Sequence, residues 1–180
     1  MVPPFHPELM LGVASYGLEL LDAAGELDAV YVPIGCGSGI CGTIAARDAL
    51  GLSTRIIGVV STNAAAAKLS FEAGNLIETN SARTFADGVA VRVPIAEAFA
   101  IYGKGAERII AVDDDAVADA MRILWKDTHN LVEGAGAIAL AGLISERQTM
   151  KGKRVGVIVS GGNIDQNDAA AVLAGQTPLT

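Results

Sequence analysis

Aromatic residues are scarce in this sequence, making up 4% of its 180 residues, and it contains only two cysteines. Because Cys36 and Cys41 lie in one short segment, they exclude a disulfide framework and a zinc cluster built from several cysteines. With so few aromatic residues, the core is expected to consist mainly of Ala, Val, Ile and Leu, within a hydrophobic content of 51%. This composition is typical of an α/β protein whose parallel sheet is buried on both faces.

Long apolar runs and an excess of positive charge are also missing. No run of about 18 apolar residues occurs, so no membrane-spanning segment is predicted. Acidic residues outnumber basic ones, 20 against 13, which gives a formal net charge of −7 and disfavours nucleic acids and anionic membranes as partners. The sequence does not open with a basic segment followed by an apolar one. No secretion signal is therefore predicted, and a reducing cytoplasm is the expected setting.

The chain alternates short apolar runs with stretches of helical periodicity, and its length suits a single domain covering residues 1–180. Strands are predicted at 29–34, 55–60, 108–112 and 154–159. Helices are predicted at 8–24, 43–50, 64–73, 94–102, 134–144 and 165–175, with a further helix capped by 113–115. This alternation predicts an α/β fold of three αβα layers with a mostly parallel sheet and right-handed crossovers.

The ends of some elements carry their own signals. Residues 1–7 are rich in proline and lack periodicity, so an extended arm is predicted there. Ser61-Thr62-Asn63 offers capping side chains for the helix at 64–73. Gly103 is expected to end the helix at 94–102.

The segment Gly35-Cys36-Gly37-Ser38-Gly39-Ile40-Cys41-Gly42 separates the first predicted strand from a predicted helix. Its four glycines leave backbone N–H groups uncovered and permit positive φ. Because N–H groups at a helix N-terminus favour an anion, the segment predicts a phosphate cradle, and a glycine turn without a ligand is the alternative. Its two cysteines are either reactive thiols at that helix terminus or small residues that fill the loop.

A second glycine-containing loop, Ser160-Gly161-Gly162-Asn163, follows the last predicted strand. Ligands of parallel sheets bind beyond the carboxyl ends of the strands, so both loops are expected to face one crevice. The first loop formally matches G-x-G-x-x-G, but no acid ends the next strand, at Val59-Val60-Ser61, to hold the ribose of a dinucleotide. A Walker loop is excluded because no Gly-Lys-Ser/Thr follows.

Taken together, these stretches resemble the pyridoxal-phosphate (PLP) enzymes of fold type II. The serine/threonine ammonia-lyases (dehydratases) are most similar, with serine racemase and hydroxyaspartate dehydratase nearby. Their phosphate loop resembles 35–42, their preceding segment resembles 5–20, and their "ADG-V" element and closing motif resemble 84–91 and 160–163. The resemblance spans nearly the whole chain, and it implies the fold of the large domain of these enzymes (tryptophan synthase beta-like), with PLP as cofactor.

The resemblance also implies roles for individual residues. Ser160 would hydrogen-bond the pyridine nitrogen, and a hydroxyl partner moderates the electron sink in a way that suits elimination. Glu133 matches a family acid near the cofactor. From the residues alone, a turn or N-cap serine and a first-turn helix acid are the alternatives for these two positions. The implied cofactor-binding set is Gly35, Cys36, Gly37, Ser38, Gly39, Gly42, Glu133, Ser160 and Gly161.

Two features of the family have no match. Some relatives bind a divalent cation through an acid just after the second strand, but residues 60–66 contain none, so no metal site is predicted.

The family's covalent lysine lies in an N-terminal motif that this chain lacks, as it lacks the family's small domain. No catalytic residue is therefore assigned, and the chain is expected to correspond to the C-terminal half of such an enzyme. All five lysines are expected to be surface charges, namely Lys68, Lys104, Lys126, Lys151 and Lys153.

The resemblance implies a parent activity, the β-elimination of a hydroxy amino acid to a 2-oxo acid and ammonia. The expected partners are a small-molecule cofactor and an amino acid. Whether the chain is itself an enzyme stays open, and it is expected to be inactive alone. A non-catalytic domain that binds a phosphorylated ligand or self-associates is one alternative, and an NAD(P)-binding domain is another. Without the other half, exposed apolar surface would favour a homo-oligomer.

Overall fold

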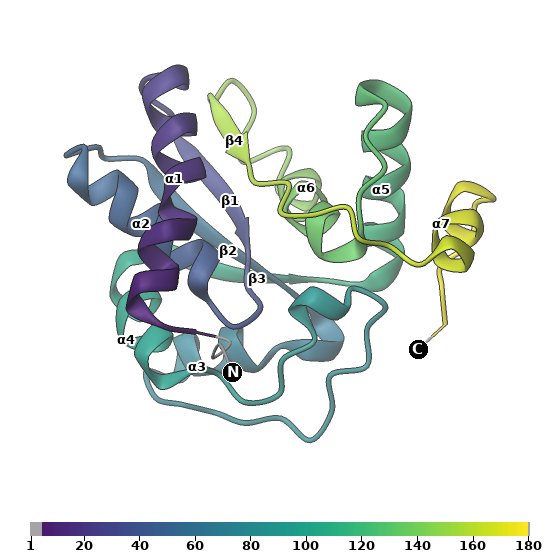
Figure 1. Ribbon diagram of the computed structural model, residues 1–180, viewed down its shortest axis with the longest axis horizontal. Coiled ribbons are helices and arrows are strands. Elements are labelled where there is room, and N and C mark those ends of the chain that lie inside the picture. The colour runs from purple at the N-terminus through teal and green to yellow at the C-terminus, as the bar shows by residue number, and fades with distance from the viewer. Residues whose placement is uncertain (1–4, 180) are drawn as a thin grey trace.

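The computed structural model describes residues 5–179, which fold around a four-stranded sheet (Figure 1). All neighbouring strands are parallel, in the order β3-β2-β1-β4. The strands are β1 (Ala29–Pro33), β2 (Arg55–Ser61), β3 (Arg108–Val112) and β4 (Val155–Val157). The predicted parallel sheet is therefore confirmed, and β3 has the predicted bounds.

Helices cover both faces of the sheet, as Figure 1 shows. One layer contains α1 (Pro7–Ala24), α2 (Ser38–Ala49), α3 (Ala66–Ala73) and α4 (Ala96–Gly105). The opposite layer contains α5 (Asp114–Thr128), α6 (Gly134–Ser145) and α7 (Gln166–Leu173). Two short 3-10 turns, η1 (Thr62–Ala64) and η2 (Asp87–Val89), interrupt the connections. The predicted three-layer arrangement is confirmed.

Alternate residues of the central strands enter two separate cores. On β1, Val30 packs with the core beneath α1 and α2, whereas its neighbour Tyr31 packs with the core beneath α6. Both side chains are fully buried. Successive strand side chains point to opposite faces, so an apolar run without alternation is what a sheet covered on both sides requires.

The ends of several elements differ from the predictions. The helix predicted to end at Gly103 continues to Gly105. Gly103 therefore lies inside α4, and Gly105, its last residue, abuts Ile44 of α2, where a side chain would collide. Ser61 caps the 3-10 turn, accepting a hydrogen bond from the Asn63 amide at 3.2 Å, while α3 begins only at Ala66.

The two ends of the described chain also correct the predictions. α1 begins at Pro7, capped by His6, whose Nδ1 accepts a hydrogen bond from the Glu8 amide at 3.2 Å. The predicted arm at 1–7 is thus shorter than expected, and its first four residues lie outside the described part. β4 covers three residues instead of six, and its pairing with β1 ends with the hydrogen bond from the Ile158 amide to the Tyr31 carbonyl at 3.0 Å. Within residues 5–179, no helix has the length and apolarity that crossing a bilayer demands.

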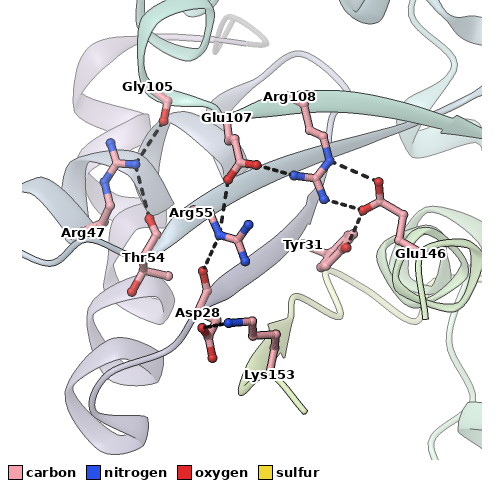
Figure 2. A network of polar contacts seen from close by, with 10 residues as sticks. All are labelled: Asp28, Tyr31, Arg47, Thr54, Arg55, Gly105, Glu107, Arg108, Glu146 and Lys153. Atoms are coloured by element: carbon pink, nitrogen blue, oxygen red, sulfur yellow. Dashed lines mark hydrogen bonds and ion pairs between the residues drawn. The ribbon is translucent and has the colours of Figure 1, made fainter. Parts of the chain in front are cut away.

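A polar network ties the amino ends of the strands together (Figure 2). At its centre, Arg108 binds the Glu146 carboxylate through Nε at 3.1 Å and Nη2 at 2.6 Å. The hydroxyl of buried Tyr31 donates to the same carboxylate at 2.5 Å. The network joins β1, β3 and the end of α6, and it lies at the strand ends opposite to the glycine loop.

Candidate functional site

The two glycine-containing loops meet in a hollow of about 200 Å³ at the carboxyl ends of the strands. Residues from five separate segments line it, and both loops are among them, so the prediction that the loops share one crevice is confirmed. The lining residues are Tyr16, Pro33, Gly35, Cys36, Gly37, Ser38, Gly39, Gly88, Val89, Glu133, Ala135 and Ser160.

The glycine loop places the start of α2 at the hollow. Gly37 is the N-cap residue, with a φ of +99° that favours glycine, and no side chain caps the helix. The first hydrogen bond runs from the Cys41 amide to the Gly37 carbonyl at 3.0 Å. The amides of Ser38 and Gly39 precede this bond, so they have no partner within the helix. Free amides and the helix dipole make this end of α2 suitable for an anion.

Close contacts, one with backbone and one with a side chain, explain two further glycines of the loop. A Cβ atom at Gly35 would collide with the carbonyl oxygen of Gly88. A Cβ atom at Gly39 would lie 2.9 Å from the hydroxyl oxygen of Tyr16, which reaches the start of α2 from α1. Burial raises the pKa of the Tyr16 phenol, so the hydroxyl stays protonated and can donate. Sequence reasoning did not identify Tyr16 as a site residue, because no local pattern indicates where a helical tyrosine points.

Two predicted site residues lie outside the lining of the hollow. Gly42 packs against α1, where a Cβ atom would come within 3.0 Å of the Ala14 nitrogen. Its role is therefore close packing of α2 on α1. Gly161 contacts the Glu133 carboxylate, and its carbonyl accepts a hydrogen bond from the Glu133 amide at 3.2 Å.

Glu133 is the N-cap residue of α6, but its side chain does not cap the helix. The carboxylate instead contacts Gly161 and faces Gly88 across the hollow, with Oε1 4.0 Å from the position of a Cβ atom there. Burial, followed by the nearby charge of Asp87, raises the pKa of Glu133, against the opposing effect of the Asn163 amide. No lysine, arginine or histidine belongs to the described residues that line the hollow.

Ser160 lies in the same hollow as the glycine loop, in the segment that follows β4. Its hydroxyl donates to the Ala135 carbonyl at 3.3 Å, a long hydrogen bond. A hydroxyl both donates and accepts, so this group can also bind a ligand atom placed in the hollow.

The two cysteines differ in their surroundings, and neither forms a disulfide. Cys36 is partly exposed and lines the hollow, whereas Cys41 is fully buried. The Cys41 thiol donates to the Ala98 carbonyl at 3.4 Å, and burial raises its pKa to about 12. The loop-filling interpretation is therefore confirmed for Cys41.

None of the five lysines, all of which belong to the described residues, lines the hollow. Lys68 forms an ion pair with Glu72 one turn further along α3. The surface interpretation is confirmed for the other four, which are exposed: Lys104, Lys126, Lys151 and Lys153. Within the described residues, no group of three or more His, Cys, Asp or Glu side chains is arranged to hold a metal ion.

Several named proteins are similar to this chain in sequence. The chain is 30% identical over 177 residues to L-threo-3-hydroxyaspartate ammonia-lyase of Saccharomyces cerevisiae, covering 98% of this chain and 54% of that protein. It is 32% identical to L-threonine ammonia-lyase of Thermotoga maritima, covering 92% of this chain and 41% of that protein. The chain thus spans about half the length of the curated relatives it matches.

Solved structures agree with the sequence relatives. The processed form of threonine deaminase isoform 2 from Solanum lycopersicum matches with a TM-score of 0.91 and 31% identity, over 97% of this chain and 49% of that one. Maize serine racemase matches with a TM-score of 0.86 and 31% identity, over 92% and 54%. The sequence profile of pyridoxal-phosphate dependent enzymes matches residues 1–161, which include the glycine loop, Glu133 and Ser160. The fold, the relatives and this profile together show that the chain belongs to the family of pyridoxal-phosphate dependent enzymes.

Proposed function

We propose that this chain binds pyridoxal phosphate as part of a lyase that eliminates water from a β-hydroxy α-amino acid. The observation that carries the proposal is the hollow in which the start of α2, Glu133 and Ser160 converge. Membership of the family supports the cofactor, and it supports PLP over a nicotinamide nucleotide. The names of the relatives, which act on threonine and on 3-hydroxyaspartate, support the class of substrate.

The residues present fit the cofactor. The phosphate would bind the free amides at the start of α2, where Gly35, Gly37 and Gly39 leave the backbone open. Cys36 and Ser38 complete that loop. The Ser160 hydroxyl would hydrogen-bond the pyridine nitrogen, and a neutral hydroxyl does not protonate that nitrogen as a carboxylic acid would.

When bound, PLP supplies an electron sink that stabilises negative charge on the α-carbon of an amino acid. The chain's own residues would orient it. Burial and Asp87 raise the pKa of Glu133, so this carboxyl group holds a proton at a higher pH than an exposed glutamate does. The elimination would expel the β-hydroxyl group as water, and hydrolysis of the remaining enamine would yield a 2-oxo acid and ammonia.

The chain by itself is proposed not to turn over substrate. Covalent PLP catalysis uses a lysine amine, and no lysine lines the hollow. Activity would then require a lysine from outside these 180 residues. A non-catalytic domain that binds phosphorylated ligands is a second candidate, which the same absence of lysine from the hollow favours.

Self-association in a reducing cytoplasm is the remaining part of the proposal. Helix α1 exposes three leucines, with Leu11 63% exposed, Leu18 41% and Leu9 39%. Leu11 and Leu18 are seven residues apart and so lie on one side of the helix, and two exposed apolar side chains there favour contact with another protein surface. Light scattering coupled to size-exclusion chromatography tests this part, and a monomeric mass would contradict it. The free state of both cysteines is compatible with a reducing compartment.

The experiment that tests the cofactor is a titration of the purified chain with PLP, followed by borohydride reduction and mass spectrometry. Pyridoxal, which lacks the phosphate, is the matched control ligand. Saturable binding of PLP, much weaker binding of pyridoxal and no covalent adduct are expected. Equal affinity for both ligands, or no saturable binding, would overturn the proposed cradle. An adduct on one lysine would overturn the claim that the chain lacks a catalytic lysine.

A further inference from the structure

One wall of the hollow belongs to a long connection between α3 and α4. Within it, η2 (Asp87–Val89) brings Gly88 and Val89 to the lining. The Gly88 carbonyl lies against Gly35, so the wall directly contacts the glycine loop. Apart from this short turn, residues 74–95 form no helix or strand. The position of the wall must therefore depend on particular contacts.

A hydrogen-bonded tether holds the start of this wall. The Thr84 hydroxyl donates to Oδ1 of Asp114 at 2.6 Å and accepts from the Ala86 amide at 3.2 Å. The Ala86 carbonyl in turn accepts from the Val89 amide at 3.0 Å. Thr84 is 7% exposed and Ala86 is fully buried, so little water competes for these bonds. Three consecutive hydrogen bonds thus connect Asp114 to the lining of the hollow.

Asp114 also anchors the tether to the sheet. It is the first residue of α5, and its Oδ1 accepts a second hydrogen bond from the hydroxyl of Ser61, at 3.2 Å. Ser61 is the last residue of β2 and is fully buried. One carboxylate therefore joins the end of β2, the start of α5 and the wall. A negative charge at the start of a helix is favourable, so this position suits an aspartate.

The neighbouring residue, Asp113, has a different structural role. Asp113 caps α5, accepting a hydrogen bond from the Ala116 amide at 2.8 Å. Asp114 is therefore not needed to cap the helix, and its side chain instead accepts hydrogen bonds from the hydroxyls of Ser61 and Thr84. This difference distinguishes a helix-stabilising aspartate from one that acts on the wall of the hollow.

We propose that Asp114 is a positioning residue, which holds residues 84–89 against the glycine loop through Thr84 and so sets the shape of the hollow. Asp114 does not itself line the hollow. The proposal rests on the proposed function only for the identity of the ligand, because the tether is defined by hydrogen bonds within the chain.

The test compares Asp114→Ala with Asp113→Ala, which removes a carboxylate from the same helix end without touching the wall. Hydrogen–deuterium exchange of residues 84–91 and the dissociation constant for PLP are measured well below the melting temperature of every variant. Asp114→Ala is expected to raise the exchange rate of residues 84–91 and the dissociation constant for PLP, each by about tenfold. This is the scale expected when hydrogen bonds to a charged group are lost. Asp113→Ala is expected to lower the melting temperature and leave both unchanged.

Two more variants keep the test decisive. In Asp114→Asn the amide oxygen can still accept both hydroxyls, so most of the PLP affinity should be restored. Thr84→Val removes the bridging hydroxyl at nearly constant volume, and it replaces Asp114→Ala as the test variant where that protein does not fold.

Each outcome decides the proposal. Exchange that is equally fast in the Asp114→Ala and Asp113→Ala proteins would overturn it, as would faster exchange with unchanged PLP affinity. If the unmodified chain binds no PLP, the proposed function fails. In that case exchange at 84–91 alone decides the role of Asp114: a difference between the two variants supports it, and equality overturns it.

Discussion

The carbonyl oxygen of Gly88 occupies the place that a side chain at Gly35 would take. The two residues are far apart in the sequence, yet their backbones touch, and both line the candidate site. A carbonyl group cannot rotate away as the end of a long side chain can. The contact therefore makes the glycine at position 35 a requirement of the tertiary structure and not only of the loop.

Gly35→Ala is expected to destabilise the protein and abolish PLP binding. The added methyl group forces the two segments apart, and overpacking of this kind costs about 1–3 kcal/mol. Gly12→Ala is the control, because no atom lies within 4 Å of the added methyl group in the interior of α1. The control should gain about 0.5–1 kcal/mol. Urea unfolding of both variants measures the difference, and equal stabilities would refute the close contact.

Tyr31→Phe is expected to destabilise the protein by about 1.5–3 kcal/mol, the range for a hydrogen bond to a charged group. The hydroxyl of Tyr31 lies in a fully buried residue and donates to Glu146. Glu72→Gln, which disrupts the partly exposed pair with Lys68, serves as the control and should cost less than about 1 kcal/mol. Both are measured by urea unfolding at pH 7. A Tyr31→Phe protein as stable as the control would show that this hydrogen bond contributes no more than a partly exposed ion pair.

Glu146 is expected to contribute to unfolding at acid pH. Burial raises the pKa of this carboxyl group, but hydrogen bonds from Arg108 and Tyr31 outweigh that effect and lower the pKa below 4.5. A carboxylate with a lowered pKa stabilises the fold above its unfolded pKa, and this contribution is lost as pH falls through the folded value. The Glu146→Gln protein should lose stability at pH 7 and show a shallower decline below pH 4.5. A parallel pH profile would contradict the assignment.

Ionisation of Glu133 is expected to lower the stability of the fold, whereas ionisation of Glu146 raises it. Its raised pKa means that the folded state binds the proton more tightly than the unfolded state, so its contribution to stability falls as pH rises above 4.5. Glu133→Gln should therefore be more stable than the unmodified protein at pH 7. Glu19→Gln, an exposed position on α1, makes the same change of charge and should have little effect. Thermal unfolding at pH 5 and pH 7 checks this, and a destabilised Glu133→Gln protein would contradict it.

The two thiols are expected to react at very different rates. Cys36 is partly exposed in the hollow, whereas Cys41 is fully buried with a pKa of about 12. In the folded protein, a disulfide reagent should modify one thiol, and the Cys36→Ser variant should react only after unfolding. PLP should slow the reaction of Cys36 if it binds the same loop. Fast modification of the Cys36→Ser protein would show that Cys41 is accessible.

Local patterns predicted most of the fold. The apolar runs at 29–34, 55–60 and 108–112 became the three longest strands, since an apolar run between turn signals needs no distant partner to be recognised. The meeting of the glycine loop with the loop at 160–163 was also predictable, because parallel strands end at the same edge of a sheet.

Where local signals failed, packing was the cause. Gly103 has the chemistry of a helix end, but α4 ends two residues later, at Gly105, where the helix packs closely against Ile44 of α2. Gly42 belongs by position to the glycine loop, yet it serves the contact between α2 and α1. A glycine permits both unusual backbone angles and close approach, and the sequence alone does not say which property is used.

By itself, the sequence determined the alternation of strands and helices, the parallel sheet and the loops that border the hollow. Only the tertiary structure decided which other residues contact these loops and support the hollow. Tyr16 contacts Gly39, Gly88 contacts Gly35, and Asp114 holds Thr84 by a hydrogen bond. Helix and strand periodicity act over a few residues, and a motif describes one segment at a time. Contacts between segments depend instead on how close the backbones come once both faces of the sheet are packed, and no local pattern contains that distance.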